Sequence, residues 1–286
     1  MIAFITGASS GIGAACAKKF AQGGYDLILN ARNEERLQAL KAEIETAFGR
    51  QVLLLPFDVR DRQAARQAVE SLPAEWQAID VLINNAGLAL GLDKEYEGNE
   101  ADYDTMIETN ITALLMMTRL VVPAMVKRDK GHIINIGSVA GDAAYPGGSV
   151  YCATKAAVKT LSDGLRMDLV HTPLRVTNIK PGLVETNFSV TRFHGDQARA
   201  DNVYKGIKPL TGEDIADVAL YAASAPAHVQ VAEVLVLATH QASGSVVHRE
   251  LGIRNYECSC SEYSEYSENS DHFQIFKFSN CTHAFR

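Results

Sequence analysis

Short runs of apolar and β-branched residues recur along this chain, and stretches with helical periodicity separate them. The runs occupy residues 2–6, 27–30, 52–57, 81–84, 133–136, 176–179 and 234–237. Parallel strands are joined by long crossovers, usually helices, and a sheet covered on both faces favours continuously apolar strands. The alternation therefore predicts an α/β protein with a single doubly wound parallel sheet of about seven strands. Ligands of such sheets bind at the carboxyl ends of the strands.

One helical stretch can be bounded from its residues alone. Its apolar positions repeat at helical spacing and are Leu37, Leu40, Ile44 and Ala47. Asn33 stands where an N-cap is needed, and Gly49 follows the last apolar position, where a left-handed residue commonly ends a helix. The pattern predicts a surface helix that packs one stripe on the sheet.

The composition excludes several classes of function. A formal net charge of −7 and a pI near 5.6 disfavour nucleic acid as a partner, because nucleic-acid-binding surfaces are usually basic. No apolar run approaches the ~20 residues of a membrane-spanning helix, and the N-terminus begins with a predicted strand instead of a signal peptide. We therefore expect a cytoplasmic protein without a membrane partner.

Residues 1–250 are expected to form one domain, and residues 251–286 an atypical tail rich in Ser, Glu and Tyr. Low hydrophobicity and a charged three-residue repeat at 261–268 predict poor order there. Binding of a partner by the tail is the alternative. Its cysteines and histidines are zinc-ligand types, but their spacing matches no compact site, so no metal is expected.

A glycine-rich turn follows the first predicted strand and leads into a helix. Gly7, Gly11 and Gly13 stand in the segment Thr6-Gly7-Ala8-Ser9-Ser10-Gly11-Ile12-Gly13. Such a turn lets backbone N–H groups and the positive end of a helix approach a pyrophosphate. The spacing differs from the common G-x-G-x-x-G form. The context of strand, turn and helix nevertheless favours a dinucleotide site in a Rossmann-type sheet.

Tyr151 and Lys155 lie four residues apart, behind Ser138 in the sequence. If residues 151–155 are helical, this spacing puts the phenol and the ammonium on one face. A nearby cation favours phenolate and lowers the pKa of a tyrosine from its usual value of about 10. The pair therefore predicts a proton shuttle for hydride-transfer chemistry.

These segments, taken in order over residues 1 to about 250, resemble the whole set of markers of the short-chain dehydrogenase/reductase family. Further markers are Asn84-Asn85-Ala86-Gly87, Asn110 and Pro181-Gly182-Leu183-Val184-Glu185-Thr186. Each residue alone could cap a turn or pack in a core, but their joint order and spacing disfavour coincidence. The catalytic residues that the resemblance implies are Asn110, Ser138, Tyr151 and Lys155.

The resemblance also implies their roles. Ser138 donates a hydrogen bond to the substrate oxygen, Tyr151 transfers the proton, and Lys155 lowers the pKa of Tyr151 and binds the nicotinamide ribose. Asn110 holds a water that connects Lys155 to solvent. The implied cofactor-binding residues are Gly7, Ala8, Ser9, Ser10, Gly11, Ile12, Gly13, Arg32, Asn33, Asp58, Val59, Asn85, Tyr151, Lys155, Pro181, Gly182, Val184 and Thr186.

The choice between NADP and NAD can be read at the end of the second strand. NAD enzymes usually carry an acidic residue there for the ribose 2′-hydroxyl, whereas an arginine accommodates a 2′-phosphate. Here Ala31 stands where the acid is expected, and Arg32 follows. An arginine that is merely solvated is the alternative. We expect NADP as the cofactor, with Asp58 and Val59 resembling the family's adenine contact.

Several stretches narrow the resemblance to the NADP-dependent 3-hydroxy acid dehydrogenases, including those that act on serine and L-allo-threonine. They are residues 82–91, 132–138, 226–229 and 247–249. This likeness implies oxidation of the β-hydroxyl of a short acid, with 3-hydroxypropionate and 3-hydroxyisobutyrate as further candidates. A carboxylate needs a cation or several N–H donors. Arg192 is the candidate and His194 a second, although Arg192 could equally be a solvated residue of a mobile segment.

Two other functions fit part of the pattern. A carbonyl reductase of broad specificity would share every catalytic residue without preferring a carboxylate. A regulatory or scaffold protein that binds NADP would keep the fold and use the tail to recruit a partner. The resemblance also implies an oligomer, a homotetramer or homodimer. The helix after Tyr151 carries Ala153, Ala156 and Ala157, whose small side chains permit close approach of a second helix.

Overall fold

A computed structural model describes residues 1–250 of the chain. It contains one seven-stranded sheet in the order β3-β2-β1-β4-β5-β6-β7, and every pair of neighbouring strands is parallel. The strands are β1 (Ile2–Thr6), β2 (Asp26–Ala31), β3 (Val52–Pro56), β4 (Val81–Asn84), β5 (His132–Ile136), β6 (Arg175–Pro181) and β7 (Glu233–Val236). The predicted doubly wound sheet is confirmed. The predictions about the tail concern residues 251–286, which lie outside the described residues.

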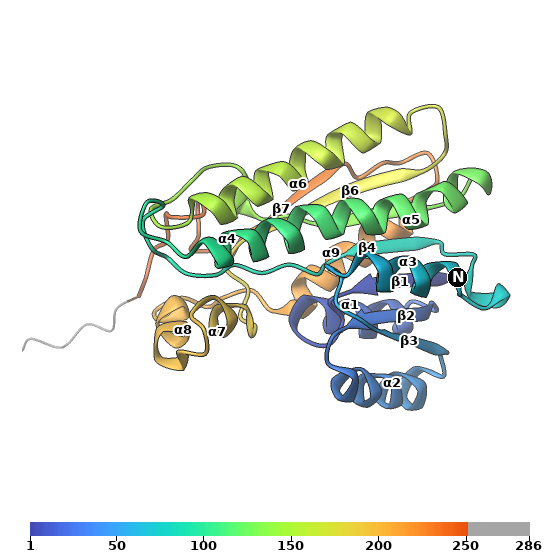
Figure 1. Cartoon of the computed structure of the whole chain (residues 1–286), viewed down its shortest axis with the longest axis horizontal. Coiled ribbons are helices and arrows are strands. Elements are labelled where there is room, and N and C mark those ends of the chain that lie inside the picture. Colours follow the sequence, from blue (N-terminus) through green and yellow to red (C-terminus); the bar gives the residue numbers. More distant parts are fainter. Residues whose placement is uncertain (251–286) are drawn as a thin grey trace, which may run out of the picture. The chain divides into compact units, whose positions relative to one another are not determined.

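Helices cover both faces of the sheet (Figure 1). On one face, α1 (Gly11–Gln22), α2 (Glu34–Phe48) and α9 (Gly212–Ser224) bury their apolar sides in one core cluster. On the other, α3 (Arg62–Glu70), α5 (Ala113–Lys127) and α6 (Ser149–Asp168) pack in a second cluster. Continuously buried strands such as β1 and β5 follow from this double cover.

The chain reverses its winding direction beside the first strand. β1 pairs with β2 on one side and with β4 on the other, so the crossovers leave it in opposite directions. Doubly wound sheets open a crevice at this switch point, outside the carboxyl ends of the strands. The short helices α7 (Phe188–Arg192) and α8 (Gln197–Tyr204) lie at that end (Figure 1).

Helix α2 is bounded as the sequence predicts. The side chain of Asn33 accepts a hydrogen bond of 2.8 Å from the backbone N–H of Arg36. Gly49 ends the helix in the left-handed conformation, with φ of 62°. Leu37, Leu40 and Ile44 are buried.

One helix in the described residues is long and apolar enough to cross a membrane by length and composition alone, although charged residues interrupt its apolar sequence. Helix α4 (Glu100–Ile107), a π-helical turn (Glu108–Thr112) and α5 form one continuous helix of 28 residues. Its most apolar window has a mean hydropathy of 1.5. Met117, Val121 and Met125 of α5 are buried in the core, so a covering helix explains the apolar sequence.

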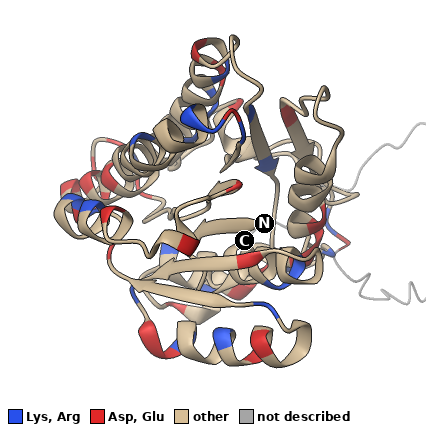
Figure 2. Ribbon diagram, turned by 90° about the vertical axis from the view of Figure 1, so that its right-hand side faces the viewer, with Lys and Arg blue, Asp and Glu red and all other residues tan. Residues whose placement is uncertain are grey.

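Acidic and basic residues are interspersed over the outer helices and loops, and neither sign forms a continuous face in Figure 2. The strands at the centre of the same view are largely uncharged. A nucleic-acid-binding surface would require a clustered basic face, so this distribution offers no support for one on the side shown.

Candidate active site

A cleft of about 1120 Å³ opens at the carboxyl ends of the strands. Segments that follow β1 to β6 line it, together with residues of the α7–α8 region. Most predicted site residues line this cleft. They are Gly7, Ser9, Ser10, Gly11, Ile12, Arg32, Asn33, Asp58, Val59, Asn85, Ser138, Tyr151, Lys155, Pro181, Gly182, Val184 and Thr186.

The glycine turn between β1 and α1 needs glycine at its positions. Gly7 and Gly11 have φ angles of 67° and 53°, in the left-handed region. A Cβ on Gly13 would lie 2.3 Å from the carbonyl oxygen of Gly7, so only glycine lets the helix start so close to the turn. Ser10 is the N-cap of α1 and makes no capping hydrogen bond with its side chain. The first turn of α1 therefore keeps N–H groups available for a phosphate.

Asn85 and Thr6 lock this turn to the end of β4. The hydroxyl of Thr6 accepts hydrogen bonds of 3.1 Å from the backbone N–H groups of Asn85 and Ala86. In return, Asn85 Nδ2 donates to the carbonyl oxygens of Thr6 at 3.0 Å and Gly7 at 3.1 Å. The side chain of Asn85 thus fixes the shape of the cleft floor.

Two arginines converge on the carboxylate of Asp58, just beyond β3. Arg60 binds it with contacts of 2.7 and 3.1 Å, and Arg32 Nη1 lies 3.8 Å away. The hydrogen bond from Arg60 holds the pKa of Asp58 below its usual value. The side chain of Arg32 is 67% exposed, so its charge faces the mouth of the cleft, where a 2′-phosphate would be bound. Arg60 was not among the predicted residues.

Tyr151 and Lys155 lie on the first turns of α6, and both side chains are buried at the cleft floor. Lys155 Nζ donates a hydrogen bond of 2.9 Å to the carbonyl oxygen of Ile136 and lies 5.9 Å from the centre of the Tyr151 ring. Ser138 is the N-cap of a 3₁₀ turn (Val139–Gly141), and its hydroxyl accepts from Ala140 N at 3.1 Å. A spacing of four on a helix therefore brings the predicted pair together.

Lys155 alone does not lower the pKa of Tyr151 in the structure, so the predicted lowering, which also counted on the positive nicotinamide ring, stays a prediction. Burial raises the pKa of Tyr151 above its usual value, and a hydrogen bond with Ser138 only partly opposes the rise. Burial also lowers the pKa of Lys155 to about 8. The low-dielectric site thus disfavours both charged forms. Ionisation of Tyr151 requires further positive charge in the cleft.

Asn110 lies in the π-helical turn between α4 and α5, and it is buried behind the cleft. Its Nδ2 donates to the carbonyl oxygen of Leu88 at 2.8 Å and to Thr154 Oγ1 at 3.0 Å, and its Oδ1 accepts from Leu88 N at 2.9 Å. Single π turns inside α-helices are frequent at functional sites. Through these bonds the side chain of Asn110 joins Leu88, in the loop after β4, to Thr154 of α6, the residue before Lys155.

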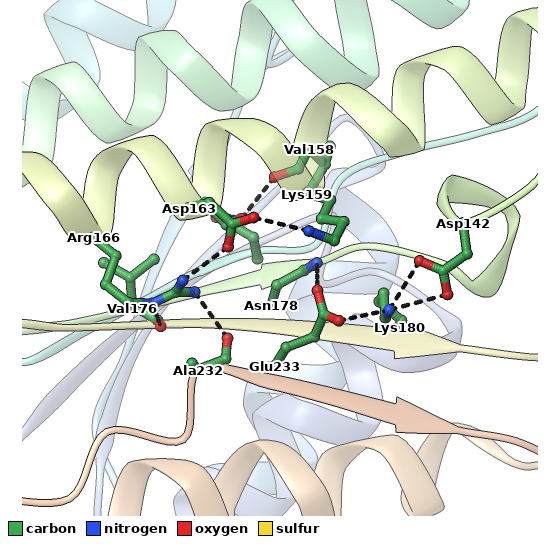
Figure 3. A network of polar contacts seen from close by, with 12 residues as sticks. Asp142, Val158, Lys159, Asp163, Arg166, Val176, Asn178, Lys180, Ala232 and Glu233 are labelled. Carbon is green, nitrogen blue, oxygen red and sulfur yellow. Dashed lines mark hydrogen bonds and ion pairs between the residues drawn. The ribbon is translucent and has the colours of Figure 1, made fainter.

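An ion network braces the turn that carries Ser138 (Figure 3). Lys180 of β6, whose side chain is 8% exposed, contacts Asp142 at 2.9 Å and Glu233 at 2.7 Å. Burial lowers the pKa of Lys180, but its bonds to the two carboxylates outweigh this effect and raise the pKa overall. Asp142 directly follows the 3₁₀ turn. The pair between Lys180 and Asp142 thus ties the end of the 3₁₀ turn to β6. No local sequence pattern predicted this link.

Arg192, the last residue of α7, points into the cleft. Its guanidinium carbon lies 5.6 Å from the centre of the Tyr151 ring and 5.5 Å from that of Tyr145. His194, the second candidate, has φ of 52°, pairs with Asp102 at 3.0 Å and is 58% exposed. It does not line the cleft.

Two predicted residues besides Asn110 lie behind the cleft surface. Ala8 is fully buried. Gly13 contributes by having no side chain, which lets α1 start close to the carbonyl oxygen of Gly7. In the described part of the chain, residues 1–250, no three His, Cys, Asp or Glu side chains gather into a metal site.

A family model described as short chain dehydrogenase matches residues 1–197 of the chain. The chain belongs to the short-chain dehydrogenase family. It is 48% identical over 251 residues to an NADP-dependent 3-hydroxy acid dehydrogenase of Salmonella typhi, covering 87% of this chain and 100% of that protein. It is 47% identical over 247 residues to an NADP-dependent 3-hydroxy acid dehydrogenase of Schizosaccharomyces pombe, covering 86% and 95% of the two chains.

The fold matches those of solved members of the short-chain dehydrogenase family. The closed form of a serine dehydrogenase complexed with NADP+ superposes with a TM-score of 0.82 at 44% identity, covering 87% of this chain and 100% of that one. The glycine cradle and Arg32 also fit a phosphorylated dinucleotide. The protein is an NADP-dependent oxidoreductase that acts on CH–OH groups.

Proposed function

We propose that the protein oxidises the β-hydroxyl of short 3-hydroxy acids, of the serine, L-allo-threonine and 3-hydroxypropionate type, and reduces the corresponding carbonyls. The observation that carries this substrate class is the guanidinium of Arg192, 5.6 Å from the Tyr151 ring inside the cleft. A cation beside Tyr151 in the cleft can bind the carboxylate of a short acid whose hydroxyl reaches Tyr151. The names of the relatives agree with the proposal.

NADP, held by the predicted cofactor-binding residues along the cleft, supplies the hydride acceptor. Ser138 donates a hydrogen bond to the substrate oxygen, which stabilises negative charge as it develops there. Tyr151 accepts the hydroxyl proton. Ser138, Tyr151 and Lys155 are themselves buried, so electrostatic contacts with them are stronger than they would be in water.

Lys155 completes the proton path in this proposal. Its pKa of about 8 lets the ammonium give up or regain a proton near neutral pH. Asn110 already uses both atoms of its side-chain amide on Leu88 and Thr154. If Asn110 also holds a relay water, the acceptors left for it are the second lone pair of Oδ1 and the backbone carbonyl, and a π-helical turn is a place where backbone groups depart from regular helical pairing.

Arg192→Ala should raise KM for serine roughly 100-fold, because a charge-assisted hydrogen bond contributes about 1.5–3 kcal/mol. The same variant should change KM for a small neutral ketone much less. Steady-state kinetics with NADPH absorbance measure both values.

His194→Ala provides the matched control for this experiment. It removes another contact of the same segment, the pair with Asp102, without removing a group from the cleft. We expect it to affect acid and ketone alike. If Arg192→Ala weakens serine and ketone equally, the enzyme is a carbonyl reductase without an acid site.

We further propose a cytoplasmic homotetramer or homodimer. On α6, Ala153 is exposed, and Ala156 and Ala157 are half-buried, which leaves room for a second helix. Ile107 and Leu115 of the long helix are also more than 40% exposed. Light scattering of the purified protein should give a mass that is a multiple of 31.0 kDa, and a monomer alone would refute the assembly.

A further inference from the structure

Arg192 reaches the cleft from a short helix, so its charge needs support to hold a fixed place. The structure supplies that support from two other segments, the loop around Gly91 and the turn that carries Tyr145. We propose that the aromatic ring of Tyr145 is a positioning element for the carboxylate subsite. Together with Gly91 it holds the guanidinium of Arg192 beside Tyr151, and it thereby sets the preference for acids. This inference rests on the proposed function.

The contact with Gly91 fixes both the backbone and the side chain of Arg192. Gly91 N donates to the carbonyl oxygen of Arg192 at 2.9 Å, and Arg192 Nε donates to the carbonyl oxygen of Gly91 at 3.2 Å. Gly91 has φ of 67°, which favours glycine. Since Nε is committed to this carbonyl, the two Nη groups are the fork that can bind both oxygens of a carboxylate.

Two aromatic rings hold the guanidinium from the cleft side. Its carbon lies 5.5 Å from the centre of the Tyr145 ring and 5.6 Å from that of Tyr151. Cation–π contacts at such distances contribute about 0.5–2 kcal/mol each. Among residues 1–250, no carboxylate forms an ion pair with Arg192, so its charge stays available to a ligand.

A pair of glycines makes room for this arrangement. A Cβ on Gly148 would lie 2.0 Å from the Tyr145 ring, and a Cβ on Gly147 would lie 2.3 Å from the carbonyl oxygen of Leu92. Gly147 also has φ of 72°. The two glycines thus let the ring and the loop at residues 91–92 approach the start of α6 together. The ring packs in the cluster that contains Tyr151 and Cys152.

The two tyrosines therefore have different roles in the proposal. Tyr151 contacts the reacting oxygen in the proposed mechanism, whereas Tyr145 acts through Arg192 on the opposite end of the substrate. A purely structural role for Tyr145 would weaken turnover of every substrate equally. A positioning role changes the ratio between a charged substrate and an uncharged one of the same shape.

The test compares kcat/KM for 3-hydroxypropionate and for 3-hydroxypropionamide, which have nearly the same shape but end in a charged carboxylate and a neutral amide, respectively. The full chain is used as wild type, Tyr145→Ala, Tyr145→Leu and Tyr145→Phe, with Tyr221→Ala as control because Tyr221 is 67% exposed on α9. In Tyr145→Ala and Tyr145→Leu the acid-to-amide ratio should fall roughly tenfold, the expected loss of one cation–π contact. Tyr145→Phe, which keeps the ring, and the control should retain the wild-type ratio.

Each outcome decides a different point. A wild type without preference for the acid would refute the proposed function. If the wild type prefers the acid and both Tyr145→Ala and Tyr145→Leu keep the full ratio, only the role of Tyr145 is refuted. Loss of the ratio in Tyr145→Phe would also overturn it, because the hydroxyl would then be the active group. Leucine preserves apolar packing, and NADPH binding measured by fluorescence identifies the variants that fold. At least one variant without the aromatic ring can therefore be compared with wild type.

Discussion

Tyr151→Phe should lose roughly 10³-fold in kcat, within the range that general acid–base catalysis contributes, while its affinity for NADPH changes little. Only the hydroxyl is removed. The ring keeps its place in the core cluster beside Phe188, whose ring centre lies 5.6 Å away. Steady-state kinetics give kcat, and quenching or enhancement of NADPH fluorescence gives the binding constant.

Tyr103→Phe is the matched control for this change. The substitution also removes a phenolic hydroxyl. That hydroxyl donates one hydrogen bond, to the carbonyl oxygen of Glu95 at 2.9 Å. It does not line the large cleft. We expect near wild-type turnover from it. Retained turnover in Tyr151→Phe would overturn the proposed mechanism.

Lys155→Met should abolish most turnover and at the same time stabilise the fold. Burial moves the pKa of Lys155 from 10.5 to about 8, which corresponds to ~3 kcal/mol against the charged form. Methionine removes this cost but forfeits the hydrogen bond to Ile136, worth about 1 kcal/mol. The free energy of unfolding at pH 7 should therefore rise by about 2 kcal/mol. Urea unfolding measures it.

The same substitution predicts a change in pH dependence. Because the folded-state pKa of Lys155 is lower than that of the unfolded chain, the unfolded chain binds more protons between pH 8 and 10.5. The contribution of Lys155 to stability therefore increases as pH rises through this window, and the penalty is full below it. The difference in stability between Lys155→Met and wild type should shrink from pH 7.5 to 9.5.

Lys159→Met serves as the control for both measurements. Lys159 lies one turn further along α6, is 40% exposed and pairs with Asp163 at 2.9 Å. It carries no burial penalty to relieve, so its removal should give no gain in stability. If Lys155→Met proves no more stable than this control, the buried ammonium is not the strained group inferred here.

Much of the fold could be predicted because its signals are local. The β4 prediction at 81–84 matches the observed strand, and the caps of α2 at Asn33 and Gly49 follow from single residues. Strands β2, β5 and β6 extend one or two residues beyond the predicted runs, because pairing with neighbours continues past the apolar residues, whereas β3 and β7 end one residue earlier than predicted. Spacing also sufficed to place Tyr151 and Lys155 together on α6.

The environment of the site could not be predicted in the same way. The pKa of Tyr151 depends on burial, which arises only when α6, the 3₁₀ turn and α7 pack together. The link from Lys180 to Asp142 joins residues 38 positions apart, and that from Arg192 to Gly91 joins residues 101 apart. Charge type alone gives no partner at such separations. Tyr145 was missed for the same reason.

The central place of β1 in the sheet bears on how the protein is made. A ribosome releases residues 2–6 before the other six strands, yet this strand must pair with β4, whose register partners begin at Val81. Until that segment emerges, one edge of a fully apolar strand stays open on the nascent chain, and parallel pairing over such sequence distances is slow. Chains interrupted before β4 should therefore depend on chaperones or aggregate, whereas interruption after α9 leaves the central strands already joined.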